Sequence, residues 1–257
     1  MMPKEIISVM KRYELKFHLN KWQVEYFKQE ILKHMKIDQY GLTTISSLYY
    51  DTPNFTLINR SIEKPAYKEK IRLRSYGVAK EGSPVFLEIK RKNEKIVYKR
   101  RIVSKEANVE RFFKSNKEFN DTQIARELLA FKEKYGELEP KYLVIYDRIA
   151  YYQDNSDVRV TLDMNPRYRV EDLNLHTSTE GISLLGEDEA ILEVKVQHSI
   201  PLWLVEILTK AKIYQTSFSK VGTAHKREMK KRFNQEVPIN QEKTIELKGG
   251  YQYGFAI

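Results

Sequence analysis

The sequence predicts an α+β fold in which about eight strands form a closed antiparallel β-barrel, with helices packed around it. Strand-like segments follow one another without crossover helices between them, which is typical of antiparallel pairing. Several of these segments carry charge on every second residue, so one face of the strand is charged and the other is apolar. Long strands with a charged face need closure or a cover, because open edges pair with other chains.

The first half of the chain begins with an expected strand over 11–18. Asn20 is a suitable N-cap, and apolar residues at helical spacing predict a helix to about Lys36. The β-branched and aromatic residues of 43–52 predict a strand that Pro53 ends, followed by a short turn or helix. A meander of three antiparallel strands is expected next, over 67–76, 85–92 and 95–103.

The second half begins with a polar segment, 104–136, whose pattern is helical and for which Gly136 is the expected C-cap. Pro201 suits the first turn of a further helix, and a last helix is expected from Ser219 to Arg232. We interpret 1–235 as one domain and 236–257 as a C-terminal tail. The strands expected in this half are 141–152, 157–163 and 190–197.

The composition favours acidic partners. The 257 residues carry a net charge of +10, which suits phosphates, nucleic acid or anionic lipid. With no cysteine and five histidines, we expect neither disulfides nor a structural zinc site. The sequence shows no secretory signal and no apolar stretch long enough to span a membrane, so we expect a cytoplasmic protein.

Charged residues two apart recur in five of the expected strands. Each segment taken alone could be a solvated outer face. Neighbouring strands with the same charge repel each other, however, and an anion held between them offsets that repulsion. The pattern therefore predicts a cationic cavity that receives a polyanion. The five segments are Arg12-x-Glu14-x-Lys16, Lys70-x-Arg72-x-Arg74, Glu88-x-Lys90, Lys99-x-Arg101 and Glu193-x-Lys195.

Two further arginines extend this pattern. Arg148 lies in a strand flanked by bulky residues, and Arg159 alternates with Thr161 and Asp163. Guanidinium groups fork onto phosphate oxygens and keep their charge at any ordinary pH. Both arginines are therefore candidates for anion binding, although either could instead pair with a nearby aspartate.

Carboxylates on the same strands could hold a divalent metal. Mg²⁺ or Mn²⁺ binds one or two carboxylates together with phosphate and water. Glu193, between apolar neighbours and beside Lys195, is the preferred ligand, followed by Glu14 and Glu88 and then Asp163. Each of these could instead be a counter-ion for the lysines.

The start of the last helix is a candidate phosphate site. Ser219 at the N-cap would leave backbone N–H groups pointing at a ligand, near Lys220 and Lys226. A solvated lysine-rich helix is the alternative interpretation. No nucleophile and base pair typical of a hydrolase triad is evident in the sequence.

The order of the segments RYELKF, SLYYDTP, YKEKIRLRSYG, VFLEIKRK, KRRI, YDRIAYY, RVTLD, AILEVKV and FSKVGTAHKRE resembles the VTC domain, the polyphosphate polymerase module of the vacuolar transporter chaperone complex. That module belongs to the triphosphate tunnel metalloenzymes. The resemblance extends over about residues 8–233. It implies a closed eight-stranded tunnel whose basic lining binds polyphosphate or a nucleoside triphosphate, with a glutamate that holds Mn²⁺ or Mg²⁺.

The resemblance also implies roles for particular residues. Glu193 would hold the metal, and Arg12 replaces the first acid of an E-x-E-x-K pattern, as suits polymerases of this type. The implied tunnel cations are Lys16, Arg72, Arg74, Lys90, Arg148 and Lys220, with Lys99 and Lys195 as further members. The remaining candidates for substrate binding are Lys70, Arg101, Arg159, Ser219 and Lys226.

The expected activity is transfer of the γ-phosphate of ATP to a growing polyphosphate chain. Hydrolysis of triphosphate or polyphosphate, and binding of polyphosphate or nucleotide without turnover, stay open as alternatives. The expected partners are ATP and inorganic polyphosphate. A nucleic-acid partner is not expected, a membrane-protein partner for the product stays open, and the sequence does not predict the oligomeric state.

Overall fold

The computed structural model describes residues 8–10, 13–63, 65–94, 96–115 and 122–236. Arg12 and the residues from 237 onward lie outside these ranges, so the division into a domain and a tail stays a prediction. The described helices are α1 (Lys21–Ile31), α2 (Thr56–Glu63), α3 (Glu106–Lys114), α4 (Gln123–Tyr135), α5 (Leu202–Lys210) and α6 (Lys220–Glu236). The strands are β1 (Ser8–Met10), β2 (Tyr13–Leu19), β3 (Lys36–Asp51), β4 (Tyr67–Tyr76), β5 (Val85–Asn93), β6 (Ile96–Ser104), β7 (Glu139–Tyr152), β8 (Arg159–Arg169), β9 (Ile182–Ser183), β10 (Ala190–Val196) and β11 (Gln215–Thr216).

The strands form one antiparallel sheet, as the sequence predicts. Its hydrogen-bonded order is β1-β6-β5-β4-β3-β7-β8-β10-β2-β11, with β9 paired to β8. The prediction of a closed eight-stranded barrel is wrong in two respects. Three short strands accompany the eight long ones, which makes eleven in the described sheet, and its two ends are not joined by backbone hydrogen bonds.

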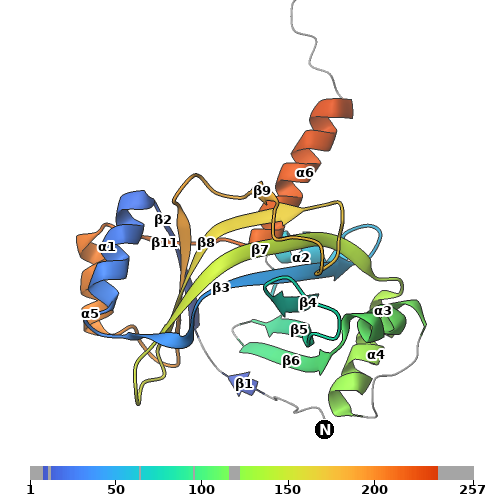
Figure 1. Ribbon diagram of the computed structural model, residues 1–257, viewed down its shortest axis with the longest axis horizontal. Coiled ribbons are helices and arrows are strands. Elements are labelled where there is room, and N and C mark those ends of the chain that lie inside the picture. The colour runs from blue at the N-terminus through green and yellow to red at the C-terminus, as the bar shows by residue number, and fades with distance from the viewer. Residues whose placement is uncertain (1–7, 11–12, 64, 95, 116–121, 237–257) are drawn as a thin grey trace, which may run out of the picture.

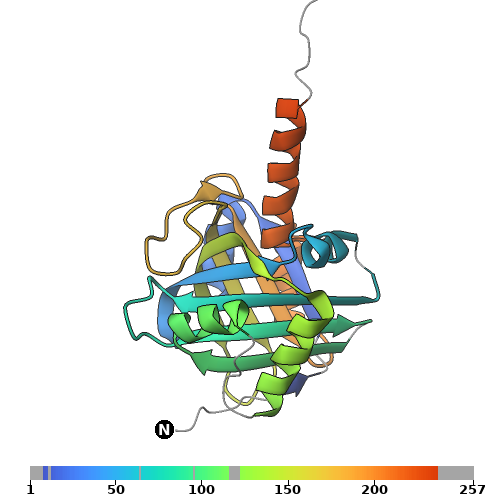
Figure 2. The same ribbon diagram turned by 90° about the vertical axis from the view of Figure 1, so that its right-hand side faces the viewer.

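The two ends of the described sheet meet at a seam without backbone hydrogen bonds, where the covalent connection and a side-chain contact hold them near each other. β1 and β2 lie toward opposite ends of the sheet, yet only residues 11–12 separate them in sequence. This connection limits the distance between the Cα atoms of Met10 and Tyr13 to about 11 Å. Across the same seam, Lys90 Nζ on β5 donates to Glu14 Oε2 on β2 at 3.1 Å. The sheet therefore curls around an interior, although its hydrogen-bonded ladder stays open (Figures 1 and 2).

Helices cover the outer face of the curled sheet in three places, each over a hydrophobic cluster of its own. α1 and α5 lie together against β2, β8 and β10, where Phe27 is fully buried. α3 and α4 lie in front of β4–β6 in Figure 2, and Phe131 belongs to the cluster beneath them. α2 and α6 pack on β3, β7 and β8 around Val221. Because the apolar side chains face these helices, the alternate residues of each strand face the interior.

Several predicted boundaries shift in the structure. Asn20 caps α1 through a capping box, as expected, but the helix ends at Ile31 because the chain turns at 32–34 and starts β3 at Lys36. The segment 104–136 divides into α3 and α4, and Gly136 ends α4 at a φ of 73°. β8 continues past residue 163, since Pro166 lies at an irregularity of the β7–β8 ladder where its missing N–H breaks no strand hydrogen bond.

Candidate functional site

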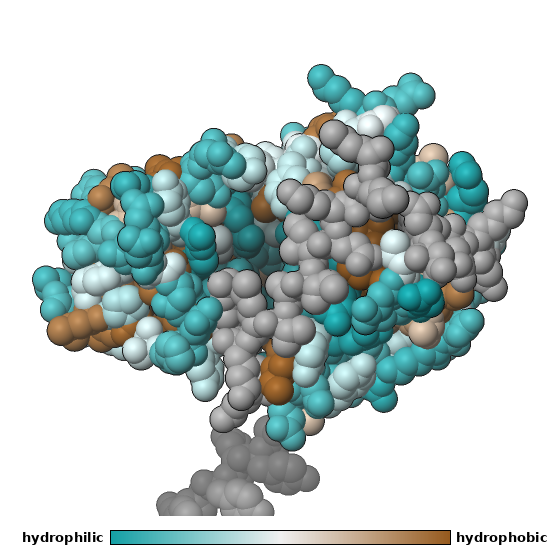
Figure 3. Space-filling view, turned by 90° about the horizontal axis from the view of Figure 1, so that it is seen from below, coloured by the Kyte–Doolittle hydropathy of each residue, from teal (hydrophilic) through white to brown (hydrophobic). Residues whose placement is uncertain are grey.

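The interior of the curled sheet contains a cationic cavity of about 300 Å³. Nine lysine or arginine side chains and three glutamates line it, together with two tyrosines, one serine and one valine. Seen from below, the molecule is hollowed near its middle, and the visible wall of the hollow is hydrophilic (Figure 3). The lining cations are Lys16, Lys70, Arg72, Arg74, Lys90, Lys99, Arg148, Lys195 and Lys220, and the glutamates are Glu14, Glu88 and Glu193.

One carboxylate organises the cations of β4 and β6. Glu88 is 1% exposed and accepts hydrogen bonds from Arg72 Nε at 2.9 Å and Arg101 Nε at 2.7 Å. Lys99 Nζ lies 2.8 Å from Oε1, and Arg74 Nη1 lies 3.9 Å from Oε2. Burial alone would raise the pKa of Glu88, but these cations hold that pKa well below its usual range. Glu88 therefore acts as a fixed anion that orients arginines toward the cavity.

A second carboxylate, Glu193 on β10, is also surrounded by cations. Its Oε1 lies 3.2 Å from Lys16 Nζ and 3.7 Å from Lys220 Nζ. Its Oε2 lies 3.3 Å from Lys195 Nζ and 3.6 Å from Arg148 Nη2. Burial opposes ionisation of Glu193, yet these charges keep its pKa well below the usual value. Glu193 is therefore an ionised carboxylate that faces the cavity.

Asp163 on β8 binds two of these cations, Arg148 and Lys220. It is fully buried, and it accepts from Arg148 Nε at 2.5 Å and from Arg148 Nη2 at 2.7 Å. Lys220 Nζ donates to the same carboxylate. The alternative that Arg148 pairs with an aspartate is thus realised in the structure, and Arg148 lines the cavity as well. Because both of its oxygens accept these bonds, Asp163 suits the role of a positioning residue.

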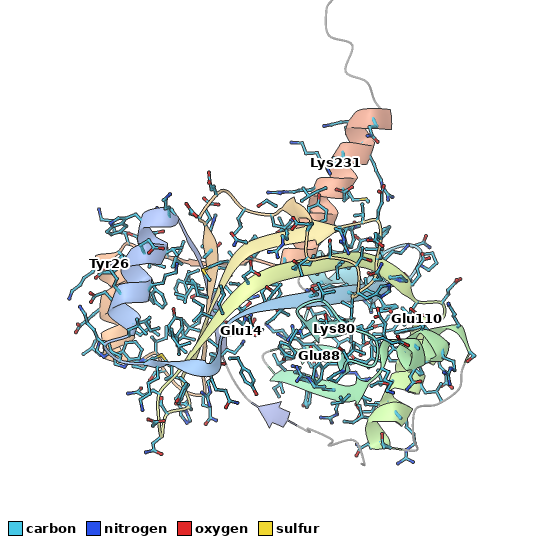
Figure 4. The ribbon with its side chains drawn as sticks, viewed as in Figure 1. Glu14, Tyr26, Lys80, Glu88, Glu110 and Lys231 are labelled. Atoms are coloured by element: carbon cyan, nitrogen blue, oxygen red, sulfur yellow. The ribbon has the colours of Figure 1, made fainter. Side chains whose placement is uncertain are left out.

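Glu14 on β2 bridges two lysines at the seam of the sheet. Its Oε2 accepts from Lys90 Nζ at 3.1 Å, and its Oε1 lies 3.4 Å from Lys16 Nζ. Burial and the nearby Glu193 oppose its ionisation, but Lys90 and the other lysines lower the pKa of Glu14 to about 2. Figure 4 places Glu14 and Glu88 within the curved sheet, whereas Tyr26 and Lys231 lie on the outer helices.

Two lysines of the cavity titrate near neutral pH. Burial lowers the pKa of Lys99 to about 7, against the attraction of Glu88. Burial also lowers the pKa of Lys70 to about 8, and the neighbouring Lys90 adds to the effect. An anion in the cavity would favour the charged form of both lysines.

The start of α6 closes one side of the cavity. The Ser219 hydroxyl accepts from the backbone N–H of Gly222 at 3.2 Å and from Lys70 Nζ at 3.2 Å, which confirms its predicted place at the helix start. Lys220 follows directly and lines the cavity. Lys226 is exposed farther along α6 and does not line it.

Two other candidates lie away from the cavity lining. Arg159 is exposed at the start of β8, where its guanidinium lies 5.7 Å from the ring centroid of Tyr152. Arg101 does not line the cavity but contributes to it through Glu88, and its guanidinium lies 4.6 Å from the ring centroid of Phe86.

Two tyrosines that line the cavity, Tyr49 and Tyr146, were not predicted from the sequence. Tyr49 Oη accepts from Arg72 Nη1 at 3.0 Å, and Tyr146 Oη accepts from Arg74 Nη2 at 3.2 Å. Burial alone would raise the pKa of Tyr49, but Arg72 and other cations lower it to about 8. Tyr146 stands two residues before Arg148 on one strand, so the period of two could have shown that they share a face. Tyr49 is recognisable only from the β3–β4 register, which pairs it with Arg72.

The oxygen donors near Glu193, and not the cations around it, would suit a divalent metal that takes its other ligands from phosphate and water. Within the described ranges no group of three or more histidines, cysteines or acids forms a complete cage. The two carboxylates Glu193 and Glu14 face one cavity, and one or two carboxylates are what Mg²⁺ uses beside a phosphate substrate. Thr161, opposite Glu193 in the β8–β10 register, has a buried hydroxyl oxygen without a partner among the described residues. These donors fit a metal–phosphate complex better than a metal held by protein alone.

The curled antiparallel sheet, with helices outside and cations inside, defines a tunnel-type α+β protein. Solved structures share this fold. A protein from Bacillus halodurans described as a candidate adenylate cyclase matches with a TM-score of 0.51 and 13% identity, over 82% of this chain and 96% of that one. A candidate adenylyl cyclase from Hippeastrum, described as having a dominant triphosphatase activity, matches with a TM-score of 0.50 and 13% identity, over 83% and 95%.

The family itself is given by the sequence. The model of the VTC domain matches residues 11–227, and the chain belongs to this family. No curated protein matches the chain. None of the described helices is long and apolar enough to cross a membrane.

Proposed function

We propose that the protein is a metal-dependent polyphosphate polymerase that transfers the γ-phosphate of ATP to a growing polyphosphate chain. One observation carries this proposal: nine cations and three carboxylates share one cavity of about 300 Å³ inside the sheet. Membership of the VTC domain family and the tunnel fold shared with solved structures support a triphosphate-tunnel enzyme. The choice of polymerisation over hydrolysis rests on the family alone.

The triphosphate of ATP would lie among Arg72, Arg74, Lys90 and Arg148. The arginines are oriented before the substrate arrives, since Glu88 and Asp163 accept their N–H groups and the tyrosine hydroxyls fix their outer edges. Preorganised cations lower the barrier because they need not reorient as charge develops on the transferred phosphoryl group.

The chemical step needs no side-chain nucleophile. An oxygen of the terminal phosphate of the chain attacks the γ-phosphorus, the bond from the γ-phosphorus to the β–γ bridging oxygen breaks, and ADP leaves with that electron pair. Lys16, Lys195 and Lys220, which surround Glu193, would bind the phosphate oxygens on the attacking side. Catalysis then consists of positioning and charge neutralisation.

Glu193 and Glu14 are the residues that would hold Mn²⁺ or Mg²⁺. The metal would supply positive charge to the phosphate oxygens during transfer. Glu88 is the weaker choice among the three glutamates, because Arg72, Arg101 and Lys99 contact its oxygens at 2.7 Å to 2.9 Å. The cations around Glu193 and Glu14 lie farther from the carboxylate oxygens, at 3.1 Å to 3.7 Å. We propose for Glu88 the role of a counter-ion that holds the arginines.

The direct test is incubation of the purified protein with ATP and Mn²⁺, with product chains resolved by gel electrophoresis and free orthophosphate measured in parallel. Long chains together with ADP are expected. Release of orthophosphate without chains would replace polymerisation by hydrolysis, the activity given for the Hippeastrum protein. Binding of polyphosphate or ATP with neither product would indicate a binding module.

A further inference from the structure

A cavity of about 760 Å³ lies on the outside of the sheet, between α3, α4, the end of β3 and the start of β7. None of its lining residues also lines the cationic cavity. Tyr50 and Phe113 belong to its floor, and their rings stack with centroids 4.1 Å apart. The other apolar lining residues are Leu48, Leu138, Pro140 and Leu173. We call it the α3–α4 cavity, and its size and apolar floor are typical of a binding site.

The lining of the α3–α4 cavity is acidic, although the chain as a whole is basic. Five glutamates and two lysines line it, in a protein with a net charge of +10. One of the two lysines, Lys132, donates to the backbone carbonyls of Phe112 and Phe113 at 2.9 Å and 2.8 Å, so its charge is directed at the end of α3. Tyr50 is 6% exposed, and among the described residues its hydroxyl has no hydrogen-bond partner. The cavity therefore suits an occupant that is apolar at its centre and cationic around it.

The exposed side of α6 has this complementary character. Val221 and Glu228 mark the side that faces the body, since Val221 is buried and Glu228 accepts from Tyr168 Oη at 2.6 Å. Residues spaced i, i+3, i+4 and i+7 share one face of a helix, and such a set lies on the opposite side of α6. Its members are Lys226, Met229, Lys230 and Phe233. We call these four residues the α6 face, and its aromatic residue is 64% exposed.

The α6 face points away from the α3–α4 cavity of its own chain. α6 packs on α2, β7 and β8, and its later part projects beyond the body of the protein (Figures 1 and 2). α3 and α4 cover β4–β6 on another side of the sheet. An α6 face that fills this cavity therefore belongs to a second molecule.

We infer that the α6 face of one copy docks into the α3–α4 cavity of a second copy. An amphipathic helix binds a groove through anchors spaced i, i+3, i+4 and i+7, which is the spacing of the α6 face. Its phenylalanine and methionine would pack on the aromatic floor, and its two lysines would lie beside the glutamates of the lining. Because each copy has both surfaces, two copies can exchange them reciprocally and close a dimer. The contact uses no residue of the cationic cavity and so goes beyond the proposed function.

The test is the oligomeric state of the full chain, measured by sedimentation equilibrium without nucleotide or polyphosphate. We expect the average mass of the wild-type protein to rise between about 1 and 100 µM, and to rise less at high salt. The variants K226E/K230E and E133K/E137K, all at exposed positions, should each weaken association by at least about tenfold.

Two further variants separate this pairing from a general effect of charge. The chain with all four substitutions exchanges the charges of the two surfaces, so it should associate within about threefold of the wild type. K33E/K210E makes the same change of charge at exposed positions beside α1 and on α5, and it should match the wild type. F233A removes an aromatic ring and no charge, and it should also weaken association.

A wild-type protein that stays monomeric up to about 100 µM would overturn the inference. A loss in K226E/K230E alone would assign the α6 face to a different acidic surface, and a loss in E133K/E137K alone would assign the cavity to a different basic segment; either result rejects the pairing. Wild-type association in F233A, or no recovery in the chain with four substitutions at unchanged unfolding, would reject it as well. Chain synthesis is not measured here, so failure of the proposed reaction would leave this contact standing.

Discussion

The substitution Glu193→Gln is the sharpest perturbation of the proposed site. It removes one negative charge that lies within 3.7 Å of Lys16, Lys195, Arg148 and Lys220. Loss of a metal ligand costs several kcal/mol in the transition state, so we expect metal-dependent turnover to fall by at least about a hundredfold. Four cations would then lose a shared partner, which we expect to lower the free energy of unfolding by roughly 1–3 kcal/mol.

Anion binding should change in the opposite direction. The carboxylate of Glu193 competes with phosphate oxygens for the same cations, so its removal should leave tripolyphosphate affinity unchanged or higher. The assays are chain synthesis across a Mn²⁺ titration, calorimetric binding of tripolyphosphate, and denaturant unfolding. Glu110→Gln on α3 is the matched control, since it removes an equal charge from an exposed outer helix (Figure 4). Unchanged metal-dependent turnover in E193Q, or lost anion binding in a folded E193Q protein, would refute the reasoning.

Three further predictions follow from the same contacts. Tripolyphosphate should bind most tightly below about pH 7, because the anion binds the charged forms of Lys99 and Lys70. Its affinity should fall as the pH rises through the pKa of Lys99 in the free protein, about 7, and then through that of Lys70, about 8. In calorimetry from pH 6 to 9, K99R should flatten the lower part of this profile, and a flat wild-type profile would contradict the prediction. Tyr49→Phe removes the oxygen that accepts from Arg72 and should weaken tripolyphosphate binding by about fivefold at unchanged stability, whereas an unchanged dissociation constant would show that the arginine needs no such support. Asp51→Ala removes the buried carboxylate that accepts from the backbone N–H groups at the start of α2. We expect it to lower the free energy of unfolding by about 2–4 kcal/mol in denaturant titrations, and a loss below about 0.5 kcal/mol would show that Asp51 does not stabilise the start of this helix.

Much of the site could be predicted because a strand has a period of two. Alternation alone placed Arg72 and Arg74 on one face and Glu88 with Lys90 on one face, and the cavity wall contains all four. The same reasoning was wrong for Arg159 at the start of β8, which was expected to bind the anion. Arg159 has the right parity, but it lies where the strand meets solvent, so parity does not bring it to the cavity.

The seam of the sheet could not be predicted from sequence. Closure depends on whether the edge strands come within hydrogen-bonding distance along their whole length, which is set by the curvature of all the strands between them. Here side-chain contacts such as Lys90 with Glu14 bridge part of the gap. Tyr49 was missed for a related reason, because its contact with Arg72 follows from the register between two strands and not from either strand alone.

The sequence by itself determined which residues are charged on one face of each strand, where most helices begin, and the family to which the chain belongs. These are local properties, fixed by periodicity, caps and motif order. Only the tertiary structure decided which carboxylate serves which cations. Glu88 and Glu193 have similar sequence surroundings, each two residues before a lysine on an apolar strand. Glu88 is saturated by Arg72, Arg101 and Lys99, whereas Glu193 faces the cavity among looser contacts of 3.2 Å to 3.7 Å. That difference arises from the neighbours that the fold brings together from distant strands, and it is what makes one glutamate an anchor and the other the proposed metal ligand.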